Sequence, residues 1–164
     1  MKKKHYKNVE NRQRISGIDS SEYFAPQLIE EAVDILGNNK NVAVIAGGTD
    51  IMVEKFERLY EVDTWMALED INELHEINIK DEKIEIGSAV THTHLVKSKI
   101  IKDEIPALKE AACDVGSPQI RNRGTIGGNI VTSSPAGDLL PVLLVYNAKL
   151  ELLSTDNKRQ VAIK

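Results

Sequence analysis

Two glycine-rich segments stand where the backbone could bind an anion. They read AGGTD at residues 46–50 and GTIGGN at residues 124–129. Glycine permits positive φ angles and close approach of a ligand, and successive N–H groups in such turns form concave anion sites. Hydroxyl groups that could add hydrogen bonds to a phosphate are present at Thr49, Thr125, Ser133 and Ser134. The pair therefore predicts two loops that close from opposite sides on a diphosphate.

Neither segment matches the well-known phosphate-binding motifs. The chain contains no GxxxxGK[ST] sequence and no GxGxxG sequence after a strand, which disfavours ATP hydrolysis and a Rossmann site. A single pair of glycines after a strand is usually a simple turn. The glycines alone therefore indicate only a nucleotide-like anion.

Apolar periodicity predicts the elements that must position these segments. Helical spacing covers residues 26–36, 94–101, 106–115 and 138–145, while strand patterns cover 42–45, 63–68, 74–80, 83–90, 148–153 and the last residues of the chain. Thr91 is placed to cap a helix, and Pro106 to begin one. The stretch 116–138 has neither period, so we expect a long loop there.

Length and composition are those of a globular protein. The 164 residues suffice for one domain or two small lobes, with 41% hydrophobic and 28% charged residues. No apolar run approaches the roughly 20 residues of a membrane helix, and no apolar segment follows the N-terminal lysines as in a secretory signal. We therefore expect a cytoplasmic protein that does not span a membrane.

Charge and cysteine content restrict the partners further. Residues 1–14 hold six basic residues and one acidic residue, which leaves 15 basic and 24 acidic residues in the remainder. The acidic remainder of the chain argues against nucleic-acid binding. We expect residues 1–21 to form a basic, disordered tail. The single cysteine, Cys113, can hold neither an iron–sulfur cluster nor a structural zinc ion. Any redox metal must lie on another chain.

Three segments together resemble a known family. AGGTD at 46–50, GSPQIRNRGTIGGNI at 116–130 and SSPAGDLLP at 133–141 are similar to the FAD-binding medium subunit of molybdenum hydroxylases, the xanthine dehydrogenase and carbon monoxide dehydrogenase flavoprotein family. The resemblance runs from about Tyr23 to Leu153 and implies an α+β fold. In this PCMH/VAO-type domain, shared with vanillyl-alcohol oxidase, two lobes hold FAD between them.

The resemblance also implies how the chain is divided. We expect a small N-terminal helix-strand lobe at residues 22–80 and a larger mixed-sheet lobe at residues 81–164. Family members run on for more than a hundred residues beyond this point, so the second lobe is expected to be truncated at its C-terminus.

Residue by residue, the resemblance implies a set of FAD contacts. The first diphosphate loop comprises Ile45, Ala46, Gly47, Gly48, Thr49 and Asp50, with Val44 and Ile51 at its edges. The second comprises Thr125, Ile126, Gly127, Gly128 and Asn129. Asp138 falls where the family has a carboxylate near the adenosine end, and Val115 falls where a bulky side chain often meets the cofactor.

The family chemistry that this implies is electron transfer. Substrate is oxidised at a molybdopterin-bound molybdenum on a large subunit, electrons cross [2Fe–2S] clusters on a small subunit, and non-covalent FAD passes them on, frequently to NAD⁺. No catalytic side chain is expected, because the cofactor carries the redox chemistry. Two alternatives stay open: a stand-alone flavin oxidoreductase of the same fold, and a truncated assembly module that does not retain FAD.

Other side chains have both a functional and a structural interpretation. Arg121 and Arg123 could bind phosphate, although exposed arginines are usually solvated. The HxH that starts at His92 lacks a third metal ligand. Trp65 could stack on a flavin, but its apolar strand favours a place in the core. Cys113 is expected to be a small buried hydrophobe on the apolar side of its helix.

Overall fold

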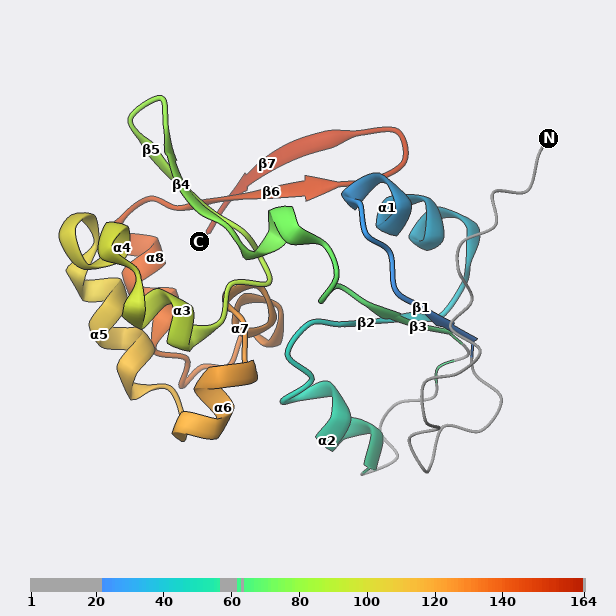
Figure 1. Cartoon of the computed structure of the whole chain (residues 1–164), viewed down its shortest axis with the longest axis horizontal. Coiled ribbons are helices and arrows are strands. Elements are labelled where there is room, and N and C mark those ends of the chain that lie inside the picture. Colours follow the sequence, from blue (N-terminus) through green and yellow to red (C-terminus); the bar gives the residue numbers. More distant parts are fainter. Residues whose placement is uncertain (1–21, 57–61, 63, 164) are drawn as a thin grey trace.

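The computed structural model describes residues 22–56, 62 and 64–163 of the chain (Figure 1). The tail expected at residues 1–21 lies outside this part. No helix among the described residues is long and apolar enough to cross a membrane.

The first lobe is built on a three-stranded parallel sheet of order β1-β3-β2. Its elements are β1 (Glu22–Phe24), α1 (Ile29–Asn38), β2 (Val42–Ile45), α2 (Ile51–Phe56) and β3 (Thr64–Ala67). All four residues of the central strand β3 are buried, including Trp65, which belongs to the core. Figure 1 shows α1 and α2 on opposite sides of the sheet. Parallel strands end at the same edge of a sheet, so the chain leaves β2 and β3 side by side.

Helix α1 covers one face of this sheet with a narrow apolar stripe. Ala32 and Ile35, three residues apart, pack against Met66 of β3 and Ile71. The helix begins three residues later than the periodicity predicts and continues through Gly37 to Asn38. Gly37 therefore lies within α1 and does not end it.

The second lobe combines helices with two antiparallel hairpins. Its elements are a 3₁₀ turn (Asn72–His75), β4 (Ile77–Lys80), β5 (Lys83–Ile86), α3 (His92–Lys97), α4 (Lys99–Glu104), α5 (Pro106–Asp114), α6 (Pro118–Arg123), α7 (Ile126–Thr132), α8 (Leu139–Val145), β6 (Lys149–Leu153) and β7 (Lys158–Ala162). Strands β4 and β5 pair with each other, as do β6 and β7. The described strands thus form two separate hairpins where we expected one mixed sheet.

Local turn chemistry explains why the β4–β5 hairpin closes on itself. Asp81 and Glu82 have φ angles of 49° and 61°. Positive φ at both central residues is typical of the type I′ turn, whose twist matches that of the flanking strands. Strand β4 therefore pairs across the lobe boundary expected at residue 80, and its Ile77 packs on the core of the second lobe.

That core is formed mainly by helices. The cluster contains Val90, Leu95, Ile101, Leu108, Ala112, Ile126, Leu139 and Leu143, contributed chiefly by α3, α4, α5, α7 and α8. The expected Thr91 cap is present, because its hydroxyl accepts a hydrogen bond from the N–H of His94 at 3.1 Å. Pro106 begins α5 as predicted.

The expectation of a long loop over residues 116–138 is wrong. Two short helices occupy it, α6 capped by Ser117 and α7 capped by Thr125. None of the residues of α6 is buried, and α7 begins with two glycines after Ile126, so neither helix shows an apolar period. The capping side chains specify both helices where hydrophobic spacing does not.

Two further expectations need correction. The helix expected over residues 94–101 is divided at Ser98, which ends α3 and caps the first turn of α4 through its hydroxyl. Cys113 is exposed, although we expected it to be buried. The buried face of α5 passes through Leu108 and Ala112, and one further position along a helix turns the side chain away from that face.

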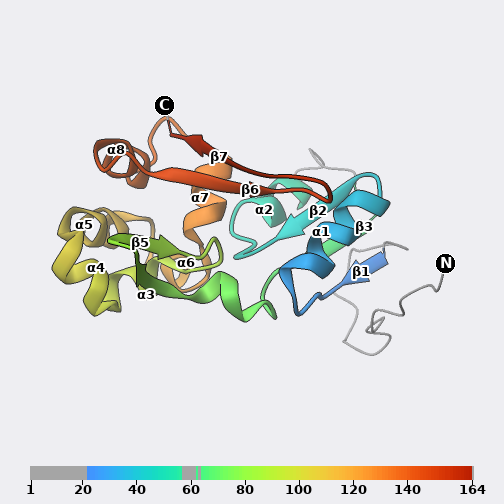
Figure 2. The same cartoon turned by 90° about the horizontal axis from the view of Figure 1, so that it is seen from above.

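The β6–β7 hairpin extends back to the first lobe. Figures 1 and 2 show it running from α8 toward α1. A Cβ atom at Gly37 would lie 2.5 Å from the side-chain methyl group of Thr155, in the turn of this hairpin. Because Gly37 has no side chain, it leaves room for the turn of the hairpin to lie against α1.

The helical core of the second lobe predicts how a core substitution changes the free energy of unfolding. Leu108 is fully buried, so Leu108→Ala should lower the free energy of unfolding by about 2–5 kcal/mol through lost burial and a residual cavity. Val131 is 84% exposed, and Val131→Ala should change the same quantity by less than about 0.5 kcal/mol. Urea denaturation followed by circular dichroism measures both, and equal effects of the two substitutions would contradict the described core.

Candidate functional site

The segment 46–50 follows the carboxyl end of β2. The N–H of Leu68 still donates to the carbonyl of Ile45 at 2.9 Å, which ties the end of β2 to the residue that follows β3. Beyond that point, no N–H of residues 46–50 donates a hydrogen bond to another described residue. Gly48 has a φ of +76°, the left-handed conformation that occurs in anion-binding turns. The loop is therefore a candidate anion site.

The segment 124–129 differs, because its N–H groups are already used. Ile126 and Gly127 donate to the carbonyls of Val90 and Ser88, both at 2.9 Å. The N–H of Gly128 donates to the Thr125 hydroxyl at 3.1 Å, and that of Asn129 to the Thr125 carbonyl at 2.9 Å. The expected second loop is therefore the capped start of α7, with few free backbone donors.

The two glycine segments are in direct contact. A Cβ atom at Gly47 would collide with the carbonyl oxygen of Arg123 and lie 3.0 Å from Cα of Gly124. At the other end of the loop, the Thr132 hydroxyl donates to the Asp50 carboxylate at 2.9 Å. The loop is thus held against α6 and α7 at both of its ends.

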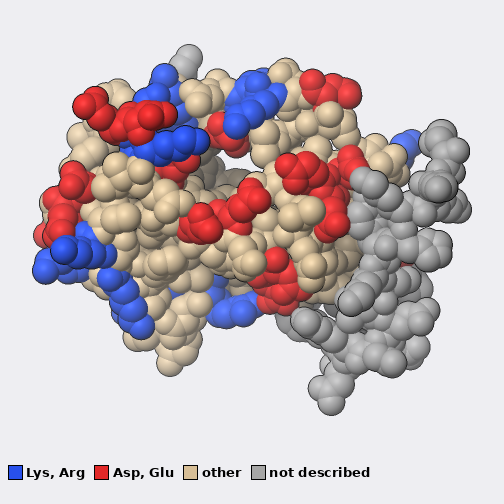
Figure 3. Space-filling model, turned by 45° about the horizontal axis from the view of Figure 1, so that its top comes forward, with Lys and Arg blue, Asp and Glu red and all other residues tan. Residues whose placement is uncertain are grey.

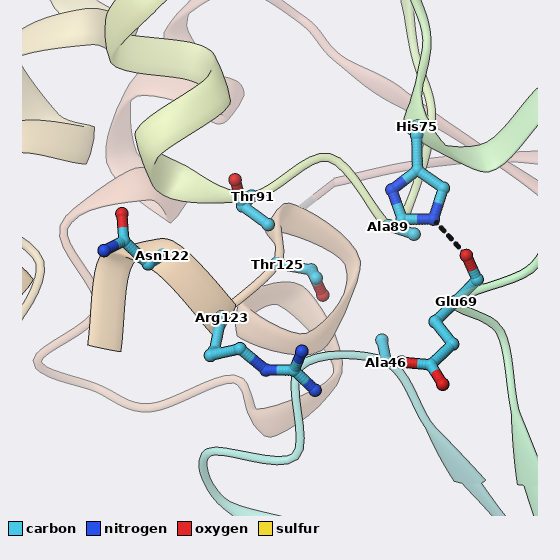
Figure 4. Close-up of a pocket in the computed structure, with 8 residues that line it drawn as sticks. All are labelled: Ala46, Glu69, His75, Ala89, Thr91, Asn122, Arg123 and Thr125. Carbon is cyan, nitrogen blue, oxygen red and sulfur yellow. Dashed lines mark hydrogen bonds between the residues drawn. The ribbon is translucent and has the colours of Figure 1, made fainter. Parts of the chain in front are cut away.

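A small cavity lies where the loop meets these helices (Figure 4). Its volume is about 60 Å³, and its lining residues are Ala46, Glu69, His75, Ala89, Thr91, Asn122, Arg123 and Thr125. Sites for whole cofactors usually measure about 300–1,000 Å³. The cavity can therefore enclose only a few atoms of a larger ligand.

The structure separates the sequence-predicted residues into two groups. Residues 45–50 and 124–129 are brought together, with Val44 and Ile51 on either side of the first segment. Val115 instead packs against the helical core of the second lobe. Asp138 is exposed just before α8 and is not among the residues that line the cavity.

Five cavity residues are not among the site residues predicted from the sequence. They are Glu69, His75, Ala89, Thr91 and Asn122. Glu69 and His75 are brought to the cavity by the segment after β3, where the ring Nε2 of His75 lies 3.2 Å from the Glu69 carbonyl oxygen. The end of a parallel strand next to a glycine loop is the signal that could have identified this segment.

One orphaned polar atom lies within the second segment. Asn129 Oδ1 is buried and has no hydrogen-bond partner among the described residues, and a Cβ atom at Gly137 would lie 3.9 Å from it. A buried acceptor of this kind is costly unless a donor reaches it. The middle of α7 therefore offers an acceptor for a ligand hydroxyl or amino group.

His92 is a buried imidazole beneath the site. Its ring contacts Gly124, and its Nδ1 has no partner among the described residues. Burial lowers the pKa of His92, the positive charge of Arg121 lowers it further, and the carboxylate of Asp50 opposes both effects. His92 is therefore neutral near pH 7. His94 lies on the exposed side of the same helix, so the HxH pair does not converge.

Comparison with known proteins identifies the family. The family model for the FAD binding domain in molybdopterin dehydrogenase matches residues 17–164. The nicotinate dehydrogenase FAD-subunit of Eubacterium barkeri is 40% identical over 144 residues, covering 87% of this chain and 49% of the relative. The xanthine dehydrogenase FAD-binding subunit of Escherichia coli O157:H7 is 34% identical over 149 residues, covering 88% and 50%.

A solved structure has the same fold. Carbon monoxide dehydrogenase from Hydrogenophaga pseudoflava, in a form that lacks the Mo-pyranopterin moiety, superimposes with a TM-score of 0.84 at 30% identity, covering 88% of this chain and 51% of the matched chain. The chain belongs to the family of FAD binding domains in molybdopterin dehydrogenases. This confirms the family and the fold class inferred from the three motifs. The chain spans about half the length of the relatives that it matches.

The two glycines of α7 should respond differently to substitution. A Cβ atom at Gly127 would lie 2.6 Å from the Ser88 carbonyl oxygen, so Gly127→Ala should lower the free energy of unfolding by about 1–3 kcal/mol. At Gly128 only the Thr125 hydroxyl lies near, at 3.1 Å, and alanine favours a helix, so Gly128→Ala should not lower it. Urea denaturation of both variants tests this, and a stable Gly127→Ala protein would contradict the packing.

His92 should make stability depend on pH. Because its folded pKa is lowered, the unfolded chain binds the proton more readily, and stability should fall as pH decreases below about 6.5 toward the folded pKa. His92→Gln should remove this part of the pH dependence of the free energy of unfolding, as measured by urea denaturation between pH 5 and pH 8. His94→Gln, at the exposed histidine of α3, is the matched control and should keep it. An unchanged slope in the His92 variant would argue against this origin.

Proposed function

We propose that this chain binds FAD as the electron-transfer subunit of a molybdenum hydroxylase complex. In this proposal it accepts electrons from [2Fe–2S] clusters on a small partner subunit, after substrate oxidation on a large molybdenum-binding subunit. It passes them to NAD⁺ or another acceptor. The observation that carries the proposal is the loop at residues 46–50, whose N–H groups donate to no other described residue and which packs against the start of α7.

The chemistry of the site fits the phosphate end of FAD. The N–H groups of Ala46, Gly47, Gly48, Thr49 and Asp50 would donate to the diphosphate, as successive free amides do in anion nests. The buried hydroxyl of Thr125 already accepts from the N–H of Gly128, and its own proton is available to a phosphate oxygen.

The other residues that the family resemblance implies as FAD contacts lie in different surroundings. The orphaned Oδ1 of Asn129 and the exposed carboxylate of Asp138 would accept from hydroxyl or amino groups of the cofactor, with Asp138 toward the adenosine end. Val44 and Ile51 would border the loop. We leave Val115 out of the proposed contacts because its side chain packs against the core of the second lobe.

When bound, FAD supplies the redox chemistry, and the chain's share is to bind and orient it. The single cysteine of the chain is exposed on α5 and cannot hold a cluster, which supports the placement of the iron–sulfur centres on a partner. The names of the relatives, as FAD subunits of nicotinate and xanthine dehydrogenases, support the same division of labour.

The small cavity supports a second candidate, an assembly module that does not retain FAD. About 60 Å³ cannot enclose a dinucleotide, whose sites usually measure about 300–1,000 Å³. Titration with FAD, followed by quenching of flavin fluorescence, separates the candidates. Saturable binding supports the proposal, whereas no uptake by the chain or by its complex with co-purifying partners would favour the module. Turnover by the isolated chain would instead favour a stand-alone flavin oxidoreductase.

Two glycines with positive φ provide a matched test of the binding loop. Gly48→Ala and Gly116→Ala each place a side chain at positive φ, +76° and +45°, at a cost of about 1–2 kcal/mol in the folded chain. Only Gly48 lies in the loop, so we expect about tenfold weaker FAD binding in its variant, because the N–H groups change direction. The Gly116 variant should bind FAD like the wild type. Equal affinity in both variants would contradict the proposed role of the loop.

A further inference from the structure

The two arginines of residues 121–123 have different surroundings. Arg121 Nη1 donates to the carbonyl oxygens of Val115 at 3.1 Å and Gly116 at 2.8 Å. These oxygens lie at the end of α5, where carbonyl groups lack partners within the helix. The guanidinium of Arg121 is therefore committed to holding the α5–α6 corner.

Arg123 is directed to the other side of α6. It lines the cavity, and Figure 4 shows its guanidinium extending toward the chain at Ala46, where β2 ends. Its side chain makes no hydrogen bond or ion pair with another described residue. The backbone of Arg123 itself contacts Gly47, so backbone packing fixes where this side chain starts relative to the loop.

Carboxylates lie close to the loop. Figure 3 shows side chains of both charges, Asp or Glu as well as Lys or Arg, around the hollow on the face that it presents. Asp50 ends the loop and Glu69 lines the cavity. A diphosphate bound by neutral N–H groups alone would be repelled by these carboxylates. A guanidinium can offset this repulsion and donate two parallel hydrogen bonds to phosphate oxygens.

We infer that Arg123 is the side chain that binds the diphosphate of FAD, opposite the N–H groups of residues 46–50. This inference rests on the proposed function and adds a charged residue to its phosphate site. Arg121 has no such role, because its donors hold the carbonyls of α5. The segment RNR thus contains one structural and one ligand-binding arginine.

Binding of FAD, ADP and riboflavin to the 164-residue chain tests the inference. ADP carries the diphosphate without the flavin, and riboflavin carries the flavin without phosphate. Arg123→Gln should raise the Kd for FAD and for ADP about tenfold, leave that for riboflavin unchanged, and reduce the weakening of FAD binding by added NaCl. Arg123→Lys should recover part of the affinity, since it keeps the charge without the paired donors.

Arg159→Gln is the matched control, because it removes the same charge from an exposed position on β7. It should bind all three ligands like the wild type. Wild-type Kd values and salt dependence in Arg123→Gln would overturn the inference and leave FAD binding intact. Binding of ADP that depends on Arg123, without binding of FAD, would support the inference and refute the proposed function. Binding of neither ligand by the wild-type chain, alone or in its complex with co-purifying partners, would refute both.

Discussion

The site depends on the close approach of two backbones, those of Gly47 and of residues 123–124. Any side chain at Gly47 would occupy the space of the Arg123 carbonyl group. The contact joins the edge of the parallel sheet to the corner between α6 and α7, and the hydrogen bond from Thr132 to Asp50 secures the other end of the loop. The free N–H groups between these two points are thereby held in place before a ligand arrives, which is the condition for preorganised binding.

The two glycine segments have different roles in the structure. In the first, glycine permits a positive φ and leaves donors free, whereas in the second, Gly127 lets α7 pack against the backbone of Ser88. The amides of the second segment support the fold, because they bond to Ser88, Val90 and the cap at Thr125. A flexible pair of loops would lose more conformational entropy on binding than one loop held against a rigid helix.

Electrostatics complements this arrangement. The chain has a net charge of −4, and carboxylates border the loop, yet its proposed ligand is an anion. The two arginines on either side of Asn122 look equivalent in sequence, but a helix places residues two apart on different faces. One guanidinium therefore turns to the end of α5 and the other to the cavity. Burial of His92 beside Gly124 keeps another positive charge away from the centre of the site.

The sequence by itself determined the family, the α+β class, the strand before AGGTD, the Thr91 cap and the pairing of the two glycine segments, because these follow from local chemistry and motif order. It did not determine which amides remain free, since an N–H group of α7 is satisfied by Ser88, far away in the chain. Helices α6 and α7 escaped detection because they lack an apolar period. Only the tertiary structure decided the place of Glu69 and Arg123 at the cavity, since that depends on how two separately folded segments pack.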